Sequence, residues 1–259
     1  LVGTILSHLY NDAAVSPVEI AKYAQYAENV YFGKPSGLMD QMASSVGSVI
    51  TIDFADTENP VIEKIDFDME AMGCALCIVD VGGNHADLTH EYAAIPAEMK
   101  AVAGFFGRDV LRGVSYRDLM ANAPLLRAQF GDRAFLRAIH FVKENERVGA
   151  IVHALKDKDY PRFLQLVTES GDSSYRYLQN VYAASDPKEQ SMAVALEMAE
   201  DLLNGRGAYR VHGGGFGGTT QNFVPLDLLD QFRTGIESVF GAGSCHVLSI
   251  RPLGGTRVF

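Results

Sequence analysis

A glycine-rich segment between two predicted strands constrains this 259-residue chain more than any other feature. Residues 208–212 and 220–224 have the composition of strands, and five of the six residues from Gly213 to Gly218 are glycine. Glycine adopts positive φ without steric cost and lets backbone N–H groups approach a ligand closely. One or two glycines would suit a tight turn or a bulge, but five of them, with a single Phe216 as anchor, favour a ligand-facing loop.

The residues that follow the loop exclude two common phosphate-binding motifs. A Walker loop needs Gly-Lys-Ser/Thr entering a helix, and the dinucleotide fingerprint also opens a helix. Here a predicted strand follows the glycines. We therefore expect the loop to support an anion through its backbone. Its glycines are Gly213, Gly214, Gly215, Gly217 and Gly218.

The order of the predicted elements indicates an α+β fold. Helices are expected at residues 1–10, 16–32, 37–45, 89–106, 132–155, 160–182, 187–204 and 226–240. Strands are expected at residues 49–54, 61–65, 75–81, 208–212, 220–224 and 245–251. Because strands and helices alternate only loosely, we expect a mainly antiparallel sheet with helices on one face rather than a doubly wound sheet. A boundary near residues 66–73 would separate a partial N-terminal domain, 1–68, from an α+β domain, 69–259.

The charge and the cysteines narrow the choice of partners and compartment. The chain has 22 Lys and Arg against 32 Asp and Glu, a formal net charge of −10, which repels nucleic-acid backbones and anionic lipid. No run approaches the ~18–20 apolar residues of a membrane span. Cys74, Cys77 and Cys245 form no disulfide framework, which is typical of a reducing compartment. We expect core thiols, a small-molecule ligand, no nucleic-acid or membrane partner, and a cytoplasmic location.

A carboxylate at the start of a short predicted helix is the main candidate for chemistry. Asp40 lies in the first turn of the helix expected at residues 37–45. Helix N–H groups stabilise the charged form of such an acid, which suits a proton acceptor or an electrostatic anchor. On local grounds alone, a solvated surface acid is the alternative interpretation.

Three other side chains are candidates, each with a structural alternative. Glu28 shares a helix face with small alanines that leave room for an ion, although on spacing alone a solvated glutamate is the default interpretation. Tyr92 begins a predicted helix and could either bond a sugar hydroxyl or anchor the core. We expect His85 to be structural rather than a base, since no Ser/His/Asp arrangement emerges.

These motifs resemble those of the GHMP small-molecule kinases, and of galactokinases in particular. The stretch Ser36-Gly37-Leu38-Met39-Asp40-Gln41 is similar to the galactokinase sequence Cys-Gly-Ile-Met-Asp-Gln, and residues 213–218 match the third motif of the family. Residues 18–29 and 84–92 are also similar to galactokinase segments, so the resemblance covers nearly the whole chain. It implies a GHMP-kinase-like fold with a remnant of the N-terminal domain and a ferredoxin-like, helical C-terminal domain with an antiparallel sheet.

The resemblance also implies a reaction, namely ATP-dependent phosphorylation of the anomeric hydroxyl of galactose. Asp40 would match the catalytic carboxylate, and Glu28 would match a Mg²⁺ ligand. Gly37 and Tyr92 would match the positions that contact the sugar. The glycine loop would support the phosphate region. In such phosphoryl transfers the protein mainly positions the reactants and neutralises charge.

Two departures from the family pattern qualify this expectation. Ser36 replaces the usual cysteine, and the Gly/Ser-rich ATP loop and the Arg/Glu/His/Asp-bearing sugar motif do not occur in the sequence. Residues 1–10 also have the apolar pattern expected in the interior of a helix rather than at its start. We therefore expect the C-terminal portion of a galactokinase, inactive by itself. The alternatives are a non-catalytic sugar-binding or sensor protein and a GHMP kinase for another sugar.

Overall fold

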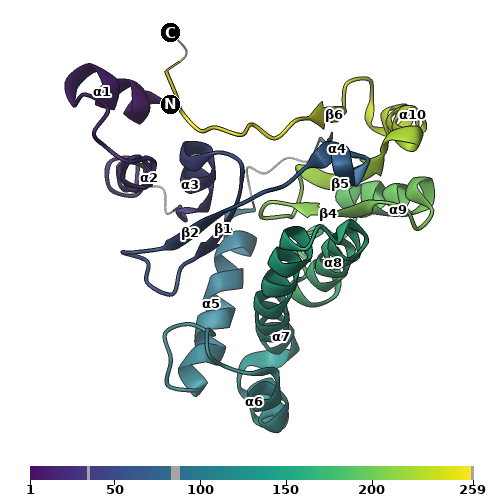
Figure 1. Cartoon of the computed structure of the whole chain (residues 1–259). Coiled ribbons are helices and arrows are strands. Elements are labelled where there is room, and N and C mark those ends of the chain that lie inside the picture. Colours follow the sequence, from purple (N-terminus) through teal and green to yellow (C-terminus); the bar gives the residue numbers. More distant parts are fainter. Residues whose placement is uncertain (34–35, 83–87, 258–259) are drawn as a thin grey trace. The chain divides into compact units, whose positions relative to one another are not determined.

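The computed structural model of the chain describes residues 1–33, 36–82 and 88–257 (Figure 1). The chain divides into two compact units. The first comprises Leu1–Phe67 and Ser249–Phe259, and the second comprises Asp68–Leu248.

The first unit contains short helices and a two-stranded antiparallel hairpin. Its elements are α1 (Val2–Tyr10), α2 (Pro17–Tyr26), the π-helical turn η1 (Ala27–Tyr31), α3 (Met39–Val46), β1 (Val49–Asp53) and β2 (Val61–Ile65). Helix α2 begins with a complete capping box, because Ser16 and Glu19 each bond the backbone N–H of the other. Ala21, Leu38 and Met42 are buried at the centre of this unit.

The C-terminal segment differs from our expectation that residues 69–259 form one domain. Residues 249–259 belong to the first unit instead. The N–H of Ser48 donates to the carbonyl of Arg251 over 2.8 Å. Gly47, at φ 72°, lies so close to this segment that a Cβ there would be 2.2 Å from the nitrogen of Gly254. The sequence could not reveal this pairing because it joins residues about 200 positions apart.

A four-stranded antiparallel sheet forms the centre of the second unit. Its strands are β3 (Cys74–Asp80), β4 (Ala208–His212), β5 (Thr219–Pro225) and β6 (Cys245–Leu248), in the order β4-β5-β3-β6. The glycine loop connects β4 to β5, as predicted. The three cysteines are buried free thiols, as expected for core residues.

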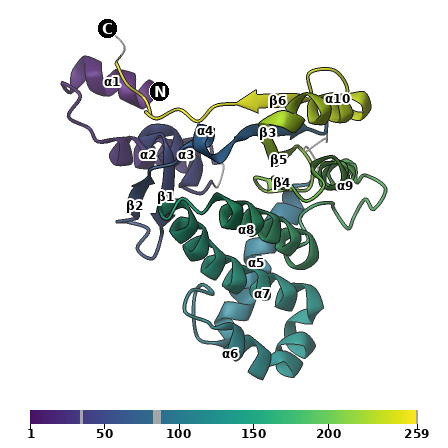
Figure 2. The ribbon, with the colours of Figure 1, turned by 45° about the vertical axis from the view of Figure 1, so that its right-hand side comes forward.

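Helices cover both faces of this sheet rather than one, with α8 (Tyr160–Ser173) on one face and α9 (Ser191–Leu203) and α10 (Leu229–Phe240) on the other. The other helices of the second unit are α4 (Met69–Met72), α5 (Thr89–Phe105), α6 (Tyr116–Ala121), α7 (Ala123–Lys156), the π-helical turn η2 (Ser174–Leu178) and the 3₁₀ turn η3 (Leu226–Leu228) (Figure 2). Val224 packs with α9 and α10, whereas the ring of Phe223 lies 5.2 Å from that of Phe163 in α8. Successive residues of a strand point to opposite faces, so helices cover both.

The element α7 is interrupted at Gly131, whose φ of 84° lies outside the helical range, so a helix follows from residue 132 to Lys156, close to the predicted 132–155. Other predicted helices have different bounds, since the helix expected at 187–204 begins at Ser191. The helix expected at 160–182 ends after the π-helical turn, where Gln179 adopts φ 58°. Within the described residues, no helix is long and apolar enough to cross a membrane.

Candidate functional site

A cavity of about 510 Å³ in the first unit brings together three of the predicted site residues. Glu28, Gly37 and Asp40 line it, although they come from η1, from the segment before α3 and from α3 itself. The other lining residues are Leu1, Ala24, Ser36, Met39, Gln41 and Ser44. The structure thus supports the grouping of these three residues, while their roles remain predictions.

The π-helical turn η1 sets the position of Glu28. Helix α2 widens into this turn at Ala27, and such turns are frequent at functional sites. The Oε2 atom of Glu28 accepts hydrogen bonds from Ser36 Oγ at 2.6 Å and from Gln41 Nε2 at 2.8 Å. A fixed carboxylate at the edge of a cavity is suited to holding a cation or a hydroxyl group.

Ser36, the residue that replaces cysteine in the galactokinase-like stretch, is part of this network. Its N–H donates to Asn29 Oδ1 at 2.7 Å, and its carbonyl accepts from Gln25 Nε2 at 3.0 Å. A serine hydroxyl is a stronger donor than a thiol, so the replacement strengthens the contact with Glu28. These bonds fix the backbone that leads into α3.

Helix α3 packs through one side and presents Asp40 on the other. Leu38 is 8% exposed and Met42 is fully buried, whereas Asp40 is exposed in the first turn. Met39 is 60% exposed and lines the cavity. Asp40 is therefore free to face a ligand while the helix itself is held by its core contacts.

The residues of this cavity fit a magnesium ion that is shared with a phosphate ligand. Mg²⁺ prefers oxygen ligands and is usually held by one or two carboxylates together with substrate phosphates and water. The cavity offers the carboxylates of Glu28 and Asp40, and the buried Oε1 of Gln41 has no hydrogen-bond partner. Among the described residues, no group of three or more His, Cys, Asp or Glu side chains forms a protein-only metal site.

The glycine loop in the second unit is held by two side chains from distant parts of the chain. The hydroxyl of Tyr92 donates to the carbonyl of Gly215 at 2.7 Å, and its ring packs edge-on against Phe216 at 5.2 Å. Asn180 bonds the loop twice, because its side-chain Nδ2 donates to the carbonyl of Gly214 and its backbone carbonyl accepts from the N–H of Phe216. Tyr92 thus supports the loop through the hydroxyl that we expected to contact a sugar.

These contacts explain why glycine is required at two positions of the loop. A Cβ on Gly214 would lie 2.7 Å from the ring of Tyr92, and one on Gly215 would lie 2.0 Å from the carbonyl oxygen of Asn180. Phe216 is buried and anchors the loop, as predicted, at φ 59°. The sequence reasoning missed Asn180, because a single asparagine after a helix gives no signal for a contact with residues more than thirty positions later.

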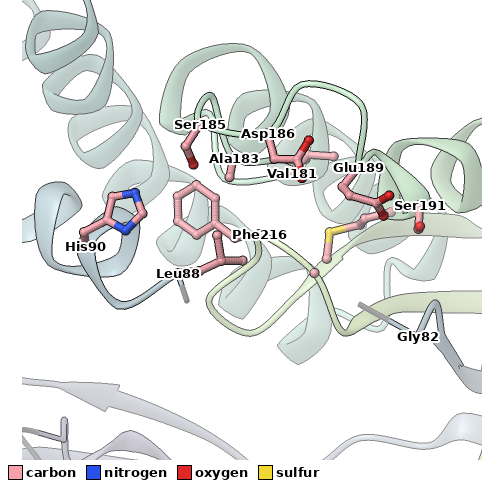
Figure 3. A pocket seen from close by; sticks show the side chains of 12 residues that line it. Gly82, Leu88, His90, Val181, Ala183, Ser185, Asp186, Glu189, Ser191 and Phe216 are labelled. Carbon is pink, nitrogen blue, oxygen red and sulfur yellow. The ribbon is translucent and has the colours of Figure 1, made fainter. Parts of the chain in front are cut away.

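A second cavity, of about 530 Å³, lies beside the glycine loop (Figure 3). Phe216 and Gly217 form part of its wall, and His90 lines it from the start of α5. Asp186 and Glu189 add two carboxylates from the segment before α9. An anion at this end of the loop would need a cation to balance these acids. The predicted anion-supporting role of the loop therefore stays a prediction.

The predicted site residues are divided between the two units. Glu28, Gly37 and Asp40 belong to the first, whereas Tyr92 and the glycine loop belong to the second. His85 lies outside the described residues, as do the other residues from 84 to 87 at the start of the galactokinase-like stretch 84–92.

Comparison with known proteins agrees with the motifs. The family model for the GHMP kinases N terminal domain matches residues 1–48. The chain is 33% identical over 244 residues to a galactokinase of Streptomyces coelicolor, covering 92% of this chain and 60% of that protein. It is 31% identical over 233 residues to a galactokinase of Actinobacillus pleuropneumoniae, covering 88% of this chain and 56% of that protein. The chain thus spans about 60% of the length of these curated relatives.

Solved structures agree on the fold. Lactococcus lactis galactokinase, complexed with galactose, matches with a TM-score of 0.76 and 24% identity over 99% of this chain and 65% of its own. The mevalonate kinase of L. major matches with a TM-score of 0.59 and 19% identity over 96% of this chain and 63% of its own. The fold is that of a GHMP kinase, and the resemblance to the galactokinase type is confirmed.

Proposed function

We propose that the whole protein is a sugar kinase of the galactokinase type, which transfers a phosphoryl group from ATP to the anomeric hydroxyl of galactose. One observation supports this most strongly. The cavity of the first unit gathers Glu28, Gly37 and Asp40 within the stretch that resembles the galactokinase motif. The galactokinase relatives, and the galactose in the Lactococcus lactis structure, support the substrate class.

In this proposal the cavity of the first unit positions the sugar. Asp40 accepts the proton of the anomeric hydroxyl or orients that hydroxyl for attack, and the backbone at Gly37 lies beside the sugar ring. Glu28, whose carboxylate is bonded by Ser36 and Gln41, would hold the metal. Mg²⁺, when bound with ATP, neutralises charge on the transferring phosphate. Most of the rate enhancement would then come from positioning and electrostatics.

The glycine loop has a supporting role in the same proposal. We infer that the two units correspond to parts of the two domains of a GHMP kinase, with the division near residues 67–68. The loop would support the phosphate region, and Tyr92 would hold the loop in its conformation. The cytoplasm, where ATP and free sugars meet, is the location that this reaction requires.

The test is a kinase assay on the whole protein with ATP, Mg²⁺ and a panel of free sugars. We expect galactose to be phosphorylated faster than other hexoses. Phosphorylation of another sugar alone would reassign the substrate within the GHMP kinases. Galactose binding without any phosphoryl transfer would support the sensor alternative and contradict the proposed function.

A further inference from the structure

Asn180 contacts the glycine loop from a distant part of the second unit. It follows the π-helical turn η2 and is only 2% exposed. Its side-chain Nδ2 donates to the carbonyl of Gly214 at 3.1 Å, and its backbone carbonyl accepts from the N–H of Phe216. No motif of the sequence includes this residue, although it bonds two residues of the loop at once.

Tyr92 and Asn180 together fix two consecutive peptide groups of the loop. The carbonyl of Gly214 is directed at Asn180, whereas the carbonyl of Gly215 accepts from the hydroxyl of Tyr92 at 2.7 Å. The C=O and the N–H of a trans peptide group point in opposite directions. The N–H of Gly215 is therefore turned away from Asn180, and the peptide group between Gly215 and Phe216 lies between Tyr92 and Asn180.

The loop conformation that these contacts hold is strained. Phe216 has φ 59°, a left-handed conformation that a residue with a bulky side chain rarely adopts. Such a conformation persists only where the surrounding structure holds it, and it is concentrated at active sites and ligand clamps. The strain at Phe216 therefore indicates that the loop conformation serves a ligand rather than the fold alone.

The backbone that carries Asn180 is itself held in place. Gln179, the preceding residue, adopts φ 58°, and its N–H donates to the carbonyl of Ser174 at 2.8 Å. The carbonyl of Leu178 accepts from the Nε of Arg137, a buried residue of α7, at 3.1 Å. A side chain supported in this way can hold its partner in one defined position.

The side-chain amide of Asn180 is used on its donor side alone. Its Oδ1 is buried and has no hydrogen-bond partner within the described part of the chain. A buried polar atom without a partner is unfavourable, whereas the carbonyl of Gly214, an exposed residue, could be satisfied by water. Stability alone would therefore favour an apolar side chain of the same shape, so the bond from Nδ2 to Gly214 points to a role in the conformation of the loop.

The contact between Asn180 and the loop borders the cavity of about 530 Å³ described above. Val181, the residue after Asn180, and Phe216 both line this cavity (Figure 3). We propose that Asn180 is a positioning residue of the kinase site. By holding the carbonyl of Gly214, it keeps the backbone of the loop in the conformation that supports the phosphate groups of ATP. This role rests on the proposed function, because it requires that the loop contacts the nucleotide.

Hydrogen exchange of the 259-residue protein, followed by mass spectrometry, tests whether Asn180 holds the loop. Asn180→Ala removes the Nδ2 donor, so the backbone amides of residues 213–218 should exchange about threefold faster or more, as expected for one lost hydrogen bond. Asn222→Ala is the matched control. Asn222 is also a buried asparagine whose Nδ2 donates to a backbone carbonyl, that of Cys77, and whose Oδ1 has no described partner. It should lower the urea midpoint by a similar amount and leave the exchange of the loop unchanged.

Steady-state kinetics of the whole protein tests the role in the reaction. Asn180→Ala should raise the KM for ATP about three- to tenfold and leave the KM for galactose within about twofold of the wild-type value. A merely structural role would instead lower kcat and leave both KM values unchanged, as we expect for Asn222→Ala. Asn180→Leu keeps the volume of the side chain and removes the donor, so it should give the same rise and serves if the alanine variant does not fold.

The proposal is overturned if Asn180→Ala leaves the exchange of the loop at the wild-type rate, or if Asn222→Ala accelerates it equally. It is also overturned if the wild type is active and neither variant of Asn180 raises the KM for ATP. A wild-type whole protein that transfers no phosphoryl group would refute the proposed function instead, so the two failures are distinguished by the activity of the wild type.

Discussion

Single residues around the first cavity divide into those that hold the site and those that, in the proposed function, face the ligand. Ser36 and Gln41 hold the carboxylate of Glu28 by hydrogen bonds, whereas Asp40 is exposed in the first turn of α3. Substitution of a residue that faces the ligand should therefore affect activity without affecting folding.

The first prediction concerns Asp40. In the whole protein, Asp40→Asn should lower kcat by about 10²–10⁴-fold, the usual contribution of a general base. The amide has the shape of the carboxylate and the position is exposed, so the free energy of unfolding should change by no more than about 1 kcal/mol. A steady-state kinase assay and chemical denaturation measure the two effects.

Asp230→Asn is the matched control, because Asp230 is also an exposed acid in the first turn of a helix, α10. It should change stability by a similar small amount and leave kcat unchanged. A near-normal kcat in Asp40→Asn would refute the assignment of Asp40.

The second prediction concerns two glycines of the loop. Gly215→Ala should lower the free energy of unfolding by about 2–5 kcal/mol, because its Cβ would overlap Asn180 and its φ of 85° disfavours alanine. Gly213→Ala, at φ 70° with no described atom within 4 Å of its Cβ, should cost only about 1–2 kcal/mol. Urea denaturation of the 259-residue protein measures both. Equal losses would contradict the close packing of Asn180 against the loop.

Among the elements, α7 and α8 are joined to β4, the strand that leads into the glycine loop, by a polar network. Arg210 of β4 donates to Ser170 of α8 at 2.7 Å, and its guanidinium lies 3.9 Å from Glu144 of α7. His140 of α7 bonds Ser173 of α8 at 3.0 Å. These contacts hold the base of the loop strand against the helices.

The network gives the third prediction, a dependence of stability on pH. Burial is the main cause that lowers the pKa of His140 below its usual 6.5, with Arg210 and Arg147 adding to it and Glu144 opposing it. The unfolded chain therefore binds a proton at a pH where the folded protein does not. Stability from this group is present above about pH 6.5 and is lost as the pH falls below that value.

Denaturation curves between pH 5 and 8 would measure this effect. The free energy of unfolding should fall toward pH 5 in the wild type, and this slope should be smaller in His140→Gln. His153→Gln, at an exposed position near the end of α7, is the control and should retain the wild-type slope. An unchanged slope in His140→Gln would contradict this account of the network.

The sequence predicted those elements whose signals are local. Helix α2 begins at Pro17, within one residue of the predicted start at residue 16, and the five-residue strands at Val61–Ile65 and Ala208–His212 have the predicted bounds. The π-helical turn that includes Glu28 was not predicted, because one extra residue per turn leaves the pattern of apolar residues nearly unchanged.

For the candidate site, contacts between residues far apart in the sequence could not be predicted. Gly37 and Asp40 lie within one short motif and could be recognised together. Asn180 and the C-terminal pairing of Arg251 with Ser48 depend on contacts across the fold, which a single sequence does not record.

At the scale of the whole molecule, the fourth prediction is that the 259-residue chain alone shows no measurable phosphoryl transfer. Its sequence contains no Gly/Ser-rich ATP loop, and it spans about 60% of the length of the galactokinases it matches. A coupled assay with ATP, Mg²⁺ and galactose would check this. Turnover near the usual kinase range of ~1–100 s⁻¹ would refute it.

The central claim is that the whole protein phosphorylates galactose. Its most direct test is the rate at which the whole protein converts galactose and ATP to galactose 1-phosphate and ADP. The account predicts turnover of roughly 1–100 s⁻¹ that requires Mg²⁺. A folded whole protein that binds galactose but forms no galactose 1-phosphate would contradict it.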